Sequence, residues 1–180
     1  MNGNGKPGSG HFTAEMLMSH PVVFVRSSQT MRQAAALMLE KGISGLPVLD
    51  HTDRAVGVLT KTDVVRYERE RLESRLAVKS GVSMKSSETS EWVAEKRGFH
   101  EEAEEDYVFN WMTPKVYTVN RRAHLGEVVR EMLARRVHRL FVHEEPEGPL
   151  VGVLTTFDLL EFLARVLHAE SGRGPLRIGP

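Results

Sequence analysis

Short runs rich in β-branched residues alternate along this chain with longer runs whose apolar residues recur every three or four positions. The short runs predict strands and the longer runs predict helices. In the first half the predicted order is a strand at 22–25, a helix at 31–41, strands at 43–49 and 56–59, and a helix from 63 to about 76. In the second half it is a strand at 116–119, a helix at 125–135, strands at 137–142 and 150–154, and a helix from 157 to about 169. The order strand–helix–strand–strand–helix therefore occurs twice.

The rest of the chain divides around these two units. A short helix at 12–19, with Thr13 as its N-cap, and an apolar segment at 108–112 lead into the two units. Gly42 follows the first long helix, where a glycine commonly ends one. We expect five parts: a disordered tail at 1–11, a first repeat at 12–76, a linker or insert at 77–107, a second repeat at 108–169 and a tail at 170–180.

The two units agree residue by residue. A shift of 94 positions matches apolar and turn residues, and one extra residue in the second hairpin makes the later shift 95; the matched pairs include Met18 with Met112, Val25 with Val119, Leu46 with Leu140, Gly57 with Gly152, Thr60 with Thr155 and Asp63 with Asp158. Each unit has a three-stranded sheet with helices for only one face, so it needs a partner to bury the other. We expect an α/β protein in which the two copies pack about a pseudo-two-fold axis as one module.

Composition narrows the possible functions. Basic and acidic residues both number 24, so the formal net charge is zero, whereas nucleic-acid binders usually have a basic excess. The chain has no cysteine, which excludes disulfides, thiolate metal sites and cysteine nucleophiles. It also has no apolar run of membrane-spanning length. We expect a cytoplasmic protein that does not enter a membrane.

The end of each unit has the pattern Thr-x-x-Asp at a strand-to-helix corner. In Thr60–Asp63 and Thr155–Asp158, the threonine hydroxyl can accept an N–H of the first helical turn, and the aspartate can accept the threonine N–H. This capping box explains both residues without any ligand. The same corner also suits an adenosine nucleotide, because a helix N-terminus attracts phosphate and an aspartate can accept the two hydroxyls of a ribose.

The whole unit resembles the cystathionine β-synthase (CBS) domain. The resemblance rests on the closing Gly-Val-Leu-Thr-x-x-Asp, on the second-strand stretches 43–48 and 137–142, and on the openings at Met18-x-x-Pro21 and Met112-Thr113-Pro114. It covers about residues 12–72 and 108–169 and suggests a stand-alone CBS pair. It implies that each aspartate binds ribose hydroxyls and that each threonine lies near phosphate. It also implies that His138 and Arg139 reach the phosphates.

The remaining residues of the expected nucleotide site line a narrow apolar slot for the base. They are Val22, Val23, Ile43, Ser44, Gly45, Leu46, Pro47, Val116, Tyr117 and Val137. The stretch Ser44–Gly45 carries no charge, so the first copy would have to recruit one from Lys61, Arg66 or Arg54. On a strand, His138 and Arg139 alternate, so one of them is expected to point to solvent.

We expect no catalytic residues and no metal site. His138 and His143 would face opposite sides of an extended chain, and no nucleophile has a recognisable setting. The expected function is regulatory: the module binds AMP, ADP, ATP or S-adenosylmethionine and modulates an unidentified protein partner. The alternative is a ligand-free scaffold that docks on an enzyme or transporter. The last helix has more apolar residues than one neighbour would cover (Leu159, Leu160, Phe162, Leu163, Val166 and Leu167), which predicts a homodimer.

Overall fold

A computed structural model describes residues 12–80, 106–146 and 148–170. The predicted tail at 1–11, most of the predicted insert and residues 171–180 lie outside this part of the chain. The elements up to the insert are α1 (Ala14–Leu17), β1 (Val25–Arg26), α2 (Met31–Glu40), β2 (Gly45–Leu49), β3 (Ala55–Thr60) and α3 (Lys61–Ser80). Those after it are α4 (Val108–Trp111), β4 (Thr118–Asn120), α5 (Leu125–Arg135), β5 (Arg139–His143), β6 (Leu150–Thr155) and α6 (Thr156–Glu170).

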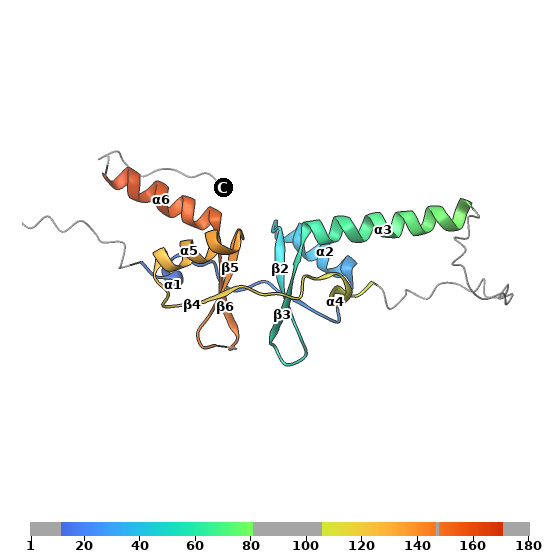
Figure 1. The fold of residues 1–180 in the computed structure, drawn as a ribbon, viewed down its shortest axis with the longest axis horizontal. Coiled ribbons are helices and arrows are strands. Elements are labelled where there is room, and N and C mark those ends of the chain that lie inside the picture. The colour runs from blue at the N-terminus through green and yellow to red at the C-terminus, as the bar shows by residue number, and fades with distance from the viewer. Residues whose placement is uncertain (1–11, 81–105, 147, 171–180) are drawn as a thin grey trace, which may run out of the picture.

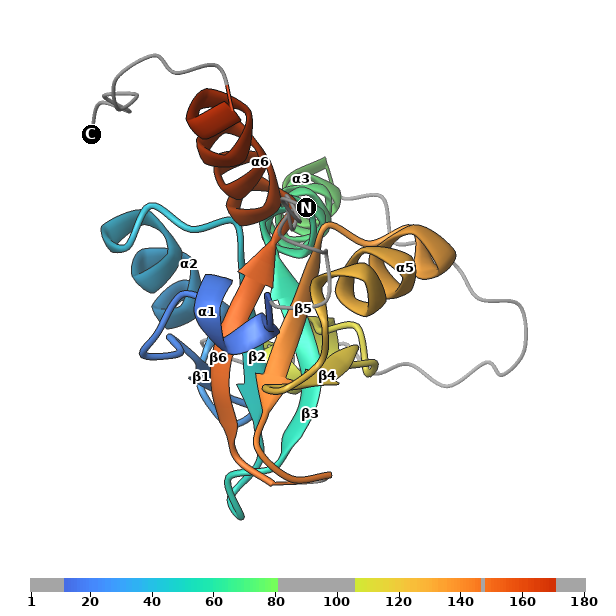
Figure 2. The ribbon, with the colours of Figure 1, turned by 90° about the vertical axis from the view of Figure 1, so that its left-hand side faces the viewer.

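The described residues form two three-stranded sheets with the same topology, ordered β1-β2-β3 and β4-β5-β6. In each sheet the first two strands are parallel and the last two are antiparallel. The sheets lie side by side at the centre, and the helices point outward, with α3 and α6 toward opposite ends (Figure 1). The view turned by 90° superimposes the strands of the two sheets, as expected for two related units (Figure 2). The predicted α/β module of two repeats is confirmed.

The predicted strand at 22–25 is wrong over most of its length, because β1 comprises only Val25 and Arg26. In the second repeat the N–H of Phe141 donates to the carbonyl of Tyr117 at 3.0 Å, just before β4. The residue equivalent to Phe141 in the first repeat is Pro47, which has no N–H to donate. The segment before Val25 therefore lacks one hydrogen bond that its counterpart makes.

The two short helices are exchanged between the repeats. Ala14 of α1 is fully buried in the core of the second repeat, and Val108 of α4 is fully buried in the core of the first. Figure 1 shows α1 on the side of the second repeat, below α6, and α4 beside α3. Each hydrophobic core is therefore completed by a segment that precedes the other repeat. Thr13 precedes α1 as predicted, but its side chain makes no capping hydrogen bond.

The exchanged segments continue along the outer strands of the opposite sheets. Ser19 and Val153 exchange backbone hydrogen bonds of 2.8 and 3.0 Å, and Thr113 and Val58 exchange two of 2.9 Å. These contacts explain the glycine in each Val-Gly-Val-Leu strand. A Cβ at Gly152 would overlap Met18 Sδ, while one at Gly57 would lie 2.6 Å from the sulfur of Met112 and 2.8 Å from the carbonyl oxygen of Thr113.

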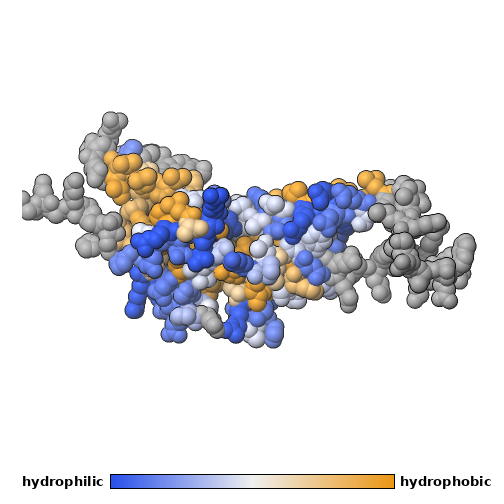
Figure 3. Space-filling view, viewed as in Figure 1, coloured by the Kyte–Doolittle hydropathy of each residue, from blue (hydrophilic) through white to orange (hydrophobic). Residues whose placement is uncertain are grey.

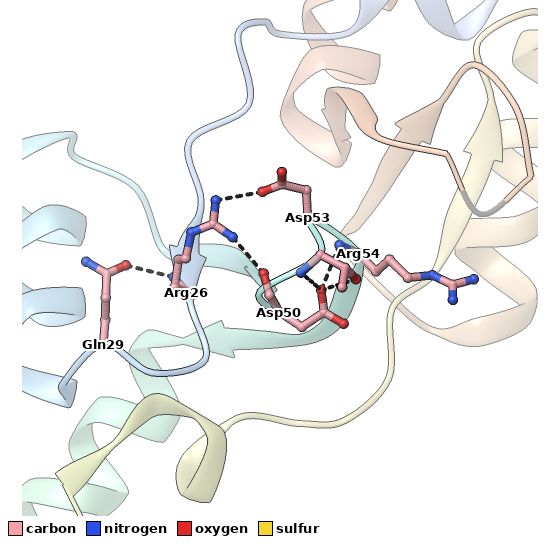
Figure 4. Close-up of polar contacts among 6 residues, drawn as sticks. Arg26, Gln29, Asp50, Asp53 and Arg54 are labelled. Carbon is pink, nitrogen blue, oxygen red and sulfur yellow. Dashed lines mark hydrogen bonds and ion pairs between the residues drawn. The ribbon is translucent and has the colours of Figure 1, made fainter.

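The far end of the first sheet is held by a network around Arg26 (Figure 4). Its guanidinium donates to the carbonyl of Asp50 and to the carboxylate of Asp53, both at 2.6 Å. The Asp50 carboxylate accepts the N–H of Arg54 at 3.0 Å and closes the turn. In the second repeat Asn120 donates to the carbonyl of Glu144 at 2.9 Å, so a side chain of the first strand holds the hairpin there as well.

Helices α2 and α5, which occupy equivalent places in the two repeats, are each followed by a residue with a left-handed backbone. Gly42 follows α2 with a φ of 65°, which confirms the predicted glycine stop. Arg136 occupies the equivalent position after α5 with a φ of 53°. A left-handed backbone is unfavourable for a residue with a Cβ, so the second repeat carries strain that the first avoids.

Candidate functional site

The two Thr-x-x-Asp corners have nearly the same geometry. The N–H and the hydroxyl of Thr60 donate to Asp63 Oδ2 at 2.8 and 2.6 Å, and the N–H of Asp63 donates to the Thr60 hydroxyl oxygen at 3.4 Å. The corresponding distances for Thr155 and Asp158 are 2.6, 2.6 and 3.4 Å. The predicted capping boxes are confirmed. Since each threonine hydroxyl donates a hydrogen bond to the aspartate, the threonine fixes the position of the carboxylate.

The second oxygen of each aspartate distinguishes the two corners. Asp63 Oδ1 forms an ion pair with Arg66 Nη2 at 3.3 Å, and Asp63 is only 6% exposed. Asp158 Oδ1 instead faces the hydroxyl of Ser19 at 3.5 Å, the outer limit of a hydrogen bond, and this aspartate is half-buried. The carboxylate of the first corner is therefore neutralised by an arginine, whereas that of the second lies beside a weakly held hydroxyl.

Arg66 joins the first corner to the exchanged helix α4. It donates to the carbonyl of Trp111 at 2.8 Å, and its guanidinium lies 5.8 Å from the centre of the Trp111 ring. The Trp111 ring meets Tyr67 edge to face, with 5.1 Å between ring centres. A cavity of about 630 Å³ opens here, lined by Arg66, Glu70, Asn110 and Trp111.

Arg139 extends from β5 into the first repeat. It donates to the Ser44 hydroxyl at 2.8 Å, and a Cβ at Gly45 would overlap its guanidinium. Gly45 and Arg139 occupy equivalent positions in the two repeats, so the glycine leaves the space that the arginine fills near the pseudo-two-fold. Arg139 Nη1 is buried and has no hydrogen-bond partner among the described residues, and burial lowers the pKa of Arg139. His138 is exposed, so the two side chains differ in exposure as expected.

The position of Arg139 places a positive charge in the first repeat, where the sequence predicted none on the second strand. Ser44 and Gly45 carry none themselves, but Arg139 supplies one from the other repeat. Of the three cations considered for the first corner, Arg66 reaches Asp63. Lys61 is exposed at the start of α3, and Arg54 is exposed in the distant β2–β3 turn.

An apolar cavity lies between the repeats on the side of the second corner. It measures about 240 Å³ and is lined by Pro21, Val22, Phe24, Leu49, Leu150 and Val151. Ser19 pairs with Val153. From this pair, the segment after Ser19 and strand β6 both lead toward the cavity, where Val22 and Val151 form part of the wall. Two residues of a strand span about 7 Å, so the cavity begins about that far along the strands from the Ser19–Val153 pair, on the side away from Asp158.

The other residues predicted to line the base slot differ in how far they are buried. Val22 is half-buried in the cavity wall, and Val116 is half-buried next to Tyr117. Val23 and Ile43 pack on the first core, Tyr117 and Val137 pack on the second, and Leu46 and Pro47 are buried in β2. The fully buried Leu46 side chain belongs to the core.

Sequence reasoning missed Ser19 and most of the cavity wall. Ser19 approaches Asp158 because its segment crosses to the second repeat, and the pattern within one repeat does not show that exchange. The sequence held one signal for Ser19: it directly follows Met18, as Thr113 directly follows the matched Met112, so a hydroxyl stands at the same position in both repeats.

The described residues contain no helix that is long and apolar enough to cross a membrane. Within the same ranges, no group of three or more His, Asp or Glu side chains is placed to hold a metal ion.

Comparison with known proteins identifies the repeated unit. The sequence profile described as "CBS domain" matches residues 14–70 and 105–165. The 5'-AMP-activated protein kinase subunit gamma of Dictyostelium discoideum is 26% identical over 144 residues, which are 79% of this chain and 22% of that protein. The chain spans between 22% and 28% of the length of the first two curated relatives that it matches.

Solved structures agree on the fold. The structure of CBSX2 in complex with AMP, a protein of Arabidopsis thaliana, matches with a TM-score of 0.62 and 23% identity over 87% of this chain and 98% of that one. The CBS domain pair of protein MJ0100, in complex with 5-methylthioadenosine and S-adenosyl-L-methionine, matches with a TM-score of 0.60 and 16% identity over 85% and 96%. With two matched repeats and this architecture, the chain belongs to the CBS domain family and forms a CBS pair.

Proposed function

We propose that this CBS pair is a regulatory, non-catalytic module that binds an adenosine nucleotide between its repeats and modulates a protein partner. The ligand class is AMP, ADP, ATP or S-adenosylmethionine. One observation carries the proposal: the Asp158 carboxylate is held by Thr155 and faces the Ser19 hydroxyl at 3.5 Å, and the segment that carries Ser19 continues at Pro21 and Val22 into the wall of an apolar cavity formed by both repeats.

The chemistry of this corner matches the three parts of a nucleotide. Asp158 Oδ1 can accept the ribose hydroxyls in place of the Ser19 hydroxyl, because that contact is long and the ligand offers stronger donors. The apolar cavity suits a flat base. The N-terminus of α6 carries a partial positive charge that favours a phosphate, and the unpaired Nη1 of Arg139 adds a cation near the pseudo-two-fold.

The relatives support an adenosine ligand. CBSX2 was solved with AMP, the MJ0100 CBS pair was solved with 5-methylthioadenosine and S-adenosyl-L-methionine, and the Dictyostelium relative is named as the gamma subunit of a 5'-AMP-activated protein kinase. The last of these is part of a larger assembly by its name, which supports a partner-modulating role.

Calorimetric titration of AMP, ADP, ATP and S-adenosylmethionine tests the proposal. We expect heat with at least one of them, and a loss of affinity of at least tenfold in Asp158→Asn, which keeps the size of the side chain but removes its charge. Asp53→Asn is the matched control, because Asp53 is an exposed aspartate in the β2–β3 turn. If protein stripped of co-purified ligand gives no heat with any of the four, the proposal is wrong.

A second candidate function is a ligand-free scaffold that acts by dimerising. Its support is the apolar surface of α6, where Phe157, Leu160, Leu163 and Leu167 are exposed. Figure 3 shows this surface as the largest apolar area on the visible face. The other apolar residues of the predicted stripe are half-buried: Leu159 packs on the second core, and Phe162 meets Phe12 with 4.6 Å between ring centres.

We propose that a second copy of the chain covers this α6 surface, with or without a ligand. Leu163→Glu is then expected to convert dimers to monomers in analytical ultracentrifugation, while Glu161→Gln on the same helix leaves them intact. The scaffold function is favoured if the wild type dimerises but no adenosine ligand changes its melting temperature.

A further inference from the structure

The two Thr-x-x-Asp corners differ in what a ligand would have to displace. In the first repeat, Asp63 Oδ2 accepts two hydrogen bonds from Thr60, and Oδ1 is paired with Arg66, so both oxygens of a nearly buried carboxylate are engaged. In the second repeat, Oδ1 of Asp158 has the Ser19 hydroxyl in that place. A diol can replace one hydroxyl by another, but it has to move a cation to reach Asp63.

Arg66 is held in place by more than the carboxylate. Its Nη2 also donates to the Trp111 carbonyl, and the guanidinium lies over the Trp111 ring. The Trp111 ring is itself held edge to face by Tyr67, whose side chain is buried. A ligand that displaced Arg66 would break these contacts together, although the Arg66 side chain is 48% exposed.

In the described part of the second repeat, no arginine or lysine pairs with Asp158 as Arg66 does with Asp63. Glu161 stands at the position that corresponds to Arg66, and it pairs with Arg165 one turn along α6. A glutamate cannot neutralise the neighbouring Asp158. The charge at this one position is therefore opposite in the two repeats, although the Thr–Asp corners themselves have the same geometry.

We propose that Arg66 blocks the first corner to a ligand by occupying the Asp63 carboxylate, so that each chain binds one adenosine ligand, at Asp158. This inference rests on the proposed nucleotide-binding function and adds its stoichiometry and the residue that sets it. Arg66 takes the place of the ligand's ribose hydroxyls at Asp63. Of the two similar corners, the ligand can therefore use only the one at Asp158.

Calorimetric stoichiometry with AMP, ADP, ATP and S-adenosylmethionine tests this inference. The wild type is expected to bind one ligand per chain, and Asp63→Asn is expected to leave that binding unchanged. Arg66→Gln, which keeps most of the side chain without its charge, is expected to raise the stoichiometry to two. Adding Asp63→Asn to Arg66→Gln should return it to one.

Two further variants provide a control and a converse test. Arg69→Gln removes an exposed arginine of the same helix that pairs with Glu73, and should leave the stoichiometry at one. Glu161→Arg places an arginine beside Asp158 and should weaken wild-type binding by at least tenfold. Melting curves establish that each variant is folded.

Other outcomes overturn the inference in distinguishable ways. Two ligands per wild-type chain, or a tenfold loss of affinity in Asp63→Asn alone, would show that a ligand uses Asp63. Either result would uphold the proposed nucleotide-binding function and refute the blocked first corner. A stoichiometry that stays at one in Arg66→Gln would show that Arg66 is not the blocking group. No heat with any ligand, in wild type and Arg66→Gln alike, would reject the proposed function and this inference with it.

Discussion

Replacing Gly152 by alanine tests the packing that attaches the exchanged segment to the second sheet. The new Cβ would overlap Met18 Sδ and would lie 2.7 Å from Met18 Cγ and 3.0 Å from Met18 Cβ. Carbon atoms in favourable contact are about 3.5–4.0 Å apart, so the methionine has to move by roughly 1 Å. The backbone cannot follow easily, because Ser19 is tied to Val153 by two hydrogen bonds.

The expected cost can be worked out from these contacts. Overpacking of a buried site costs about 1–3 kcal/mol, and the flexibility of methionine favours the lower part of that range. Replacing glycine by alanine recovers about 0.4–1 kcal/mol by restricting the unfolded chain. The net loss is therefore about 1 kcal/mol, equivalent to a drop in melting temperature of roughly 2–4 °C for a chain of this size.

Urea unfolding of a double-mutant cycle measures this effect. In a Met18→Ala background the clash is absent, so Gly152→Ala should stabilise the protein by about 0.4–1 kcal/mol. The difference between the two backgrounds then gives a coupling energy of about 1–2 kcal/mol. Gly126→Ala is the matched control, because nothing lies within 4 Å of a Cβ at Gly126 in helix α5. It should stabilise the protein by about 0.5–1 kcal/mol. A Gly152→Ala variant as stable as the wild type, or one equally destabilised without Met18, would refute the reasoning.

Three further predictions concern single positions. Arg136→Gly should raise the free energy of unfolding by up to ~1 kcal/mol, since glycine relieves the left-handed backbone, and a denaturant midpoint that falls would contradict this. Gly45→Ala should lower the melting temperature because its Cβ overlaps the Arg139 guanidinium, and Arg139→Ala should suppress most of that loss; an equal loss in both backgrounds would reject the explanation. The hydrogen bond from Arg121 lowers the pKa of Glu15 below 4.5, so its contribution to stability is present above that value and disappears as the pH falls through the lowered pKa. The melting temperatures of wild type and Glu15→Gln should therefore differ near neutral pH and converge in acid, and a constant difference would count against the pair.

The sequence predicted most of the architecture because local physics decides it. The residue pattern located α2, α5 and the strands β2, β3, β5 and β6, whereas β4 begins two residues later than predicted. The capping chemistry of Thr60 and Asp63 followed from their spacing alone. The strand predicted at 22–25 is mostly absent because the neighbouring residue in β2 is Pro47, which has no N–H to donate. That proline is distant in sequence, and the missing hydrogen bond matters only once the two segments are side by side.

The candidate site was less predictable because it is built from contacts between repeats. The pattern marks Met18 and Ala14 as apolar, but it does not say which of two similar cores they enter. Arg139 was expected to serve its own repeat, yet Gly45 leaves room for it in the other. Arg66 was one of several candidate cations, and only the geometry distinguishes it from the exposed charges nearby.

The exchange of α1 and α4 makes the two halves of the chain mutually dependent. Proteolytic cleavage between residues 81 and 105 would leave an N-terminal fragment whose core needs α4 and a C-terminal fragment whose core needs α1. The two fragments should therefore stay together as a complex after the covalent link is cut, and each should complement the other when they are expressed separately. A single copy of the repeat could satisfy its own core only by taking this helix from a second chain.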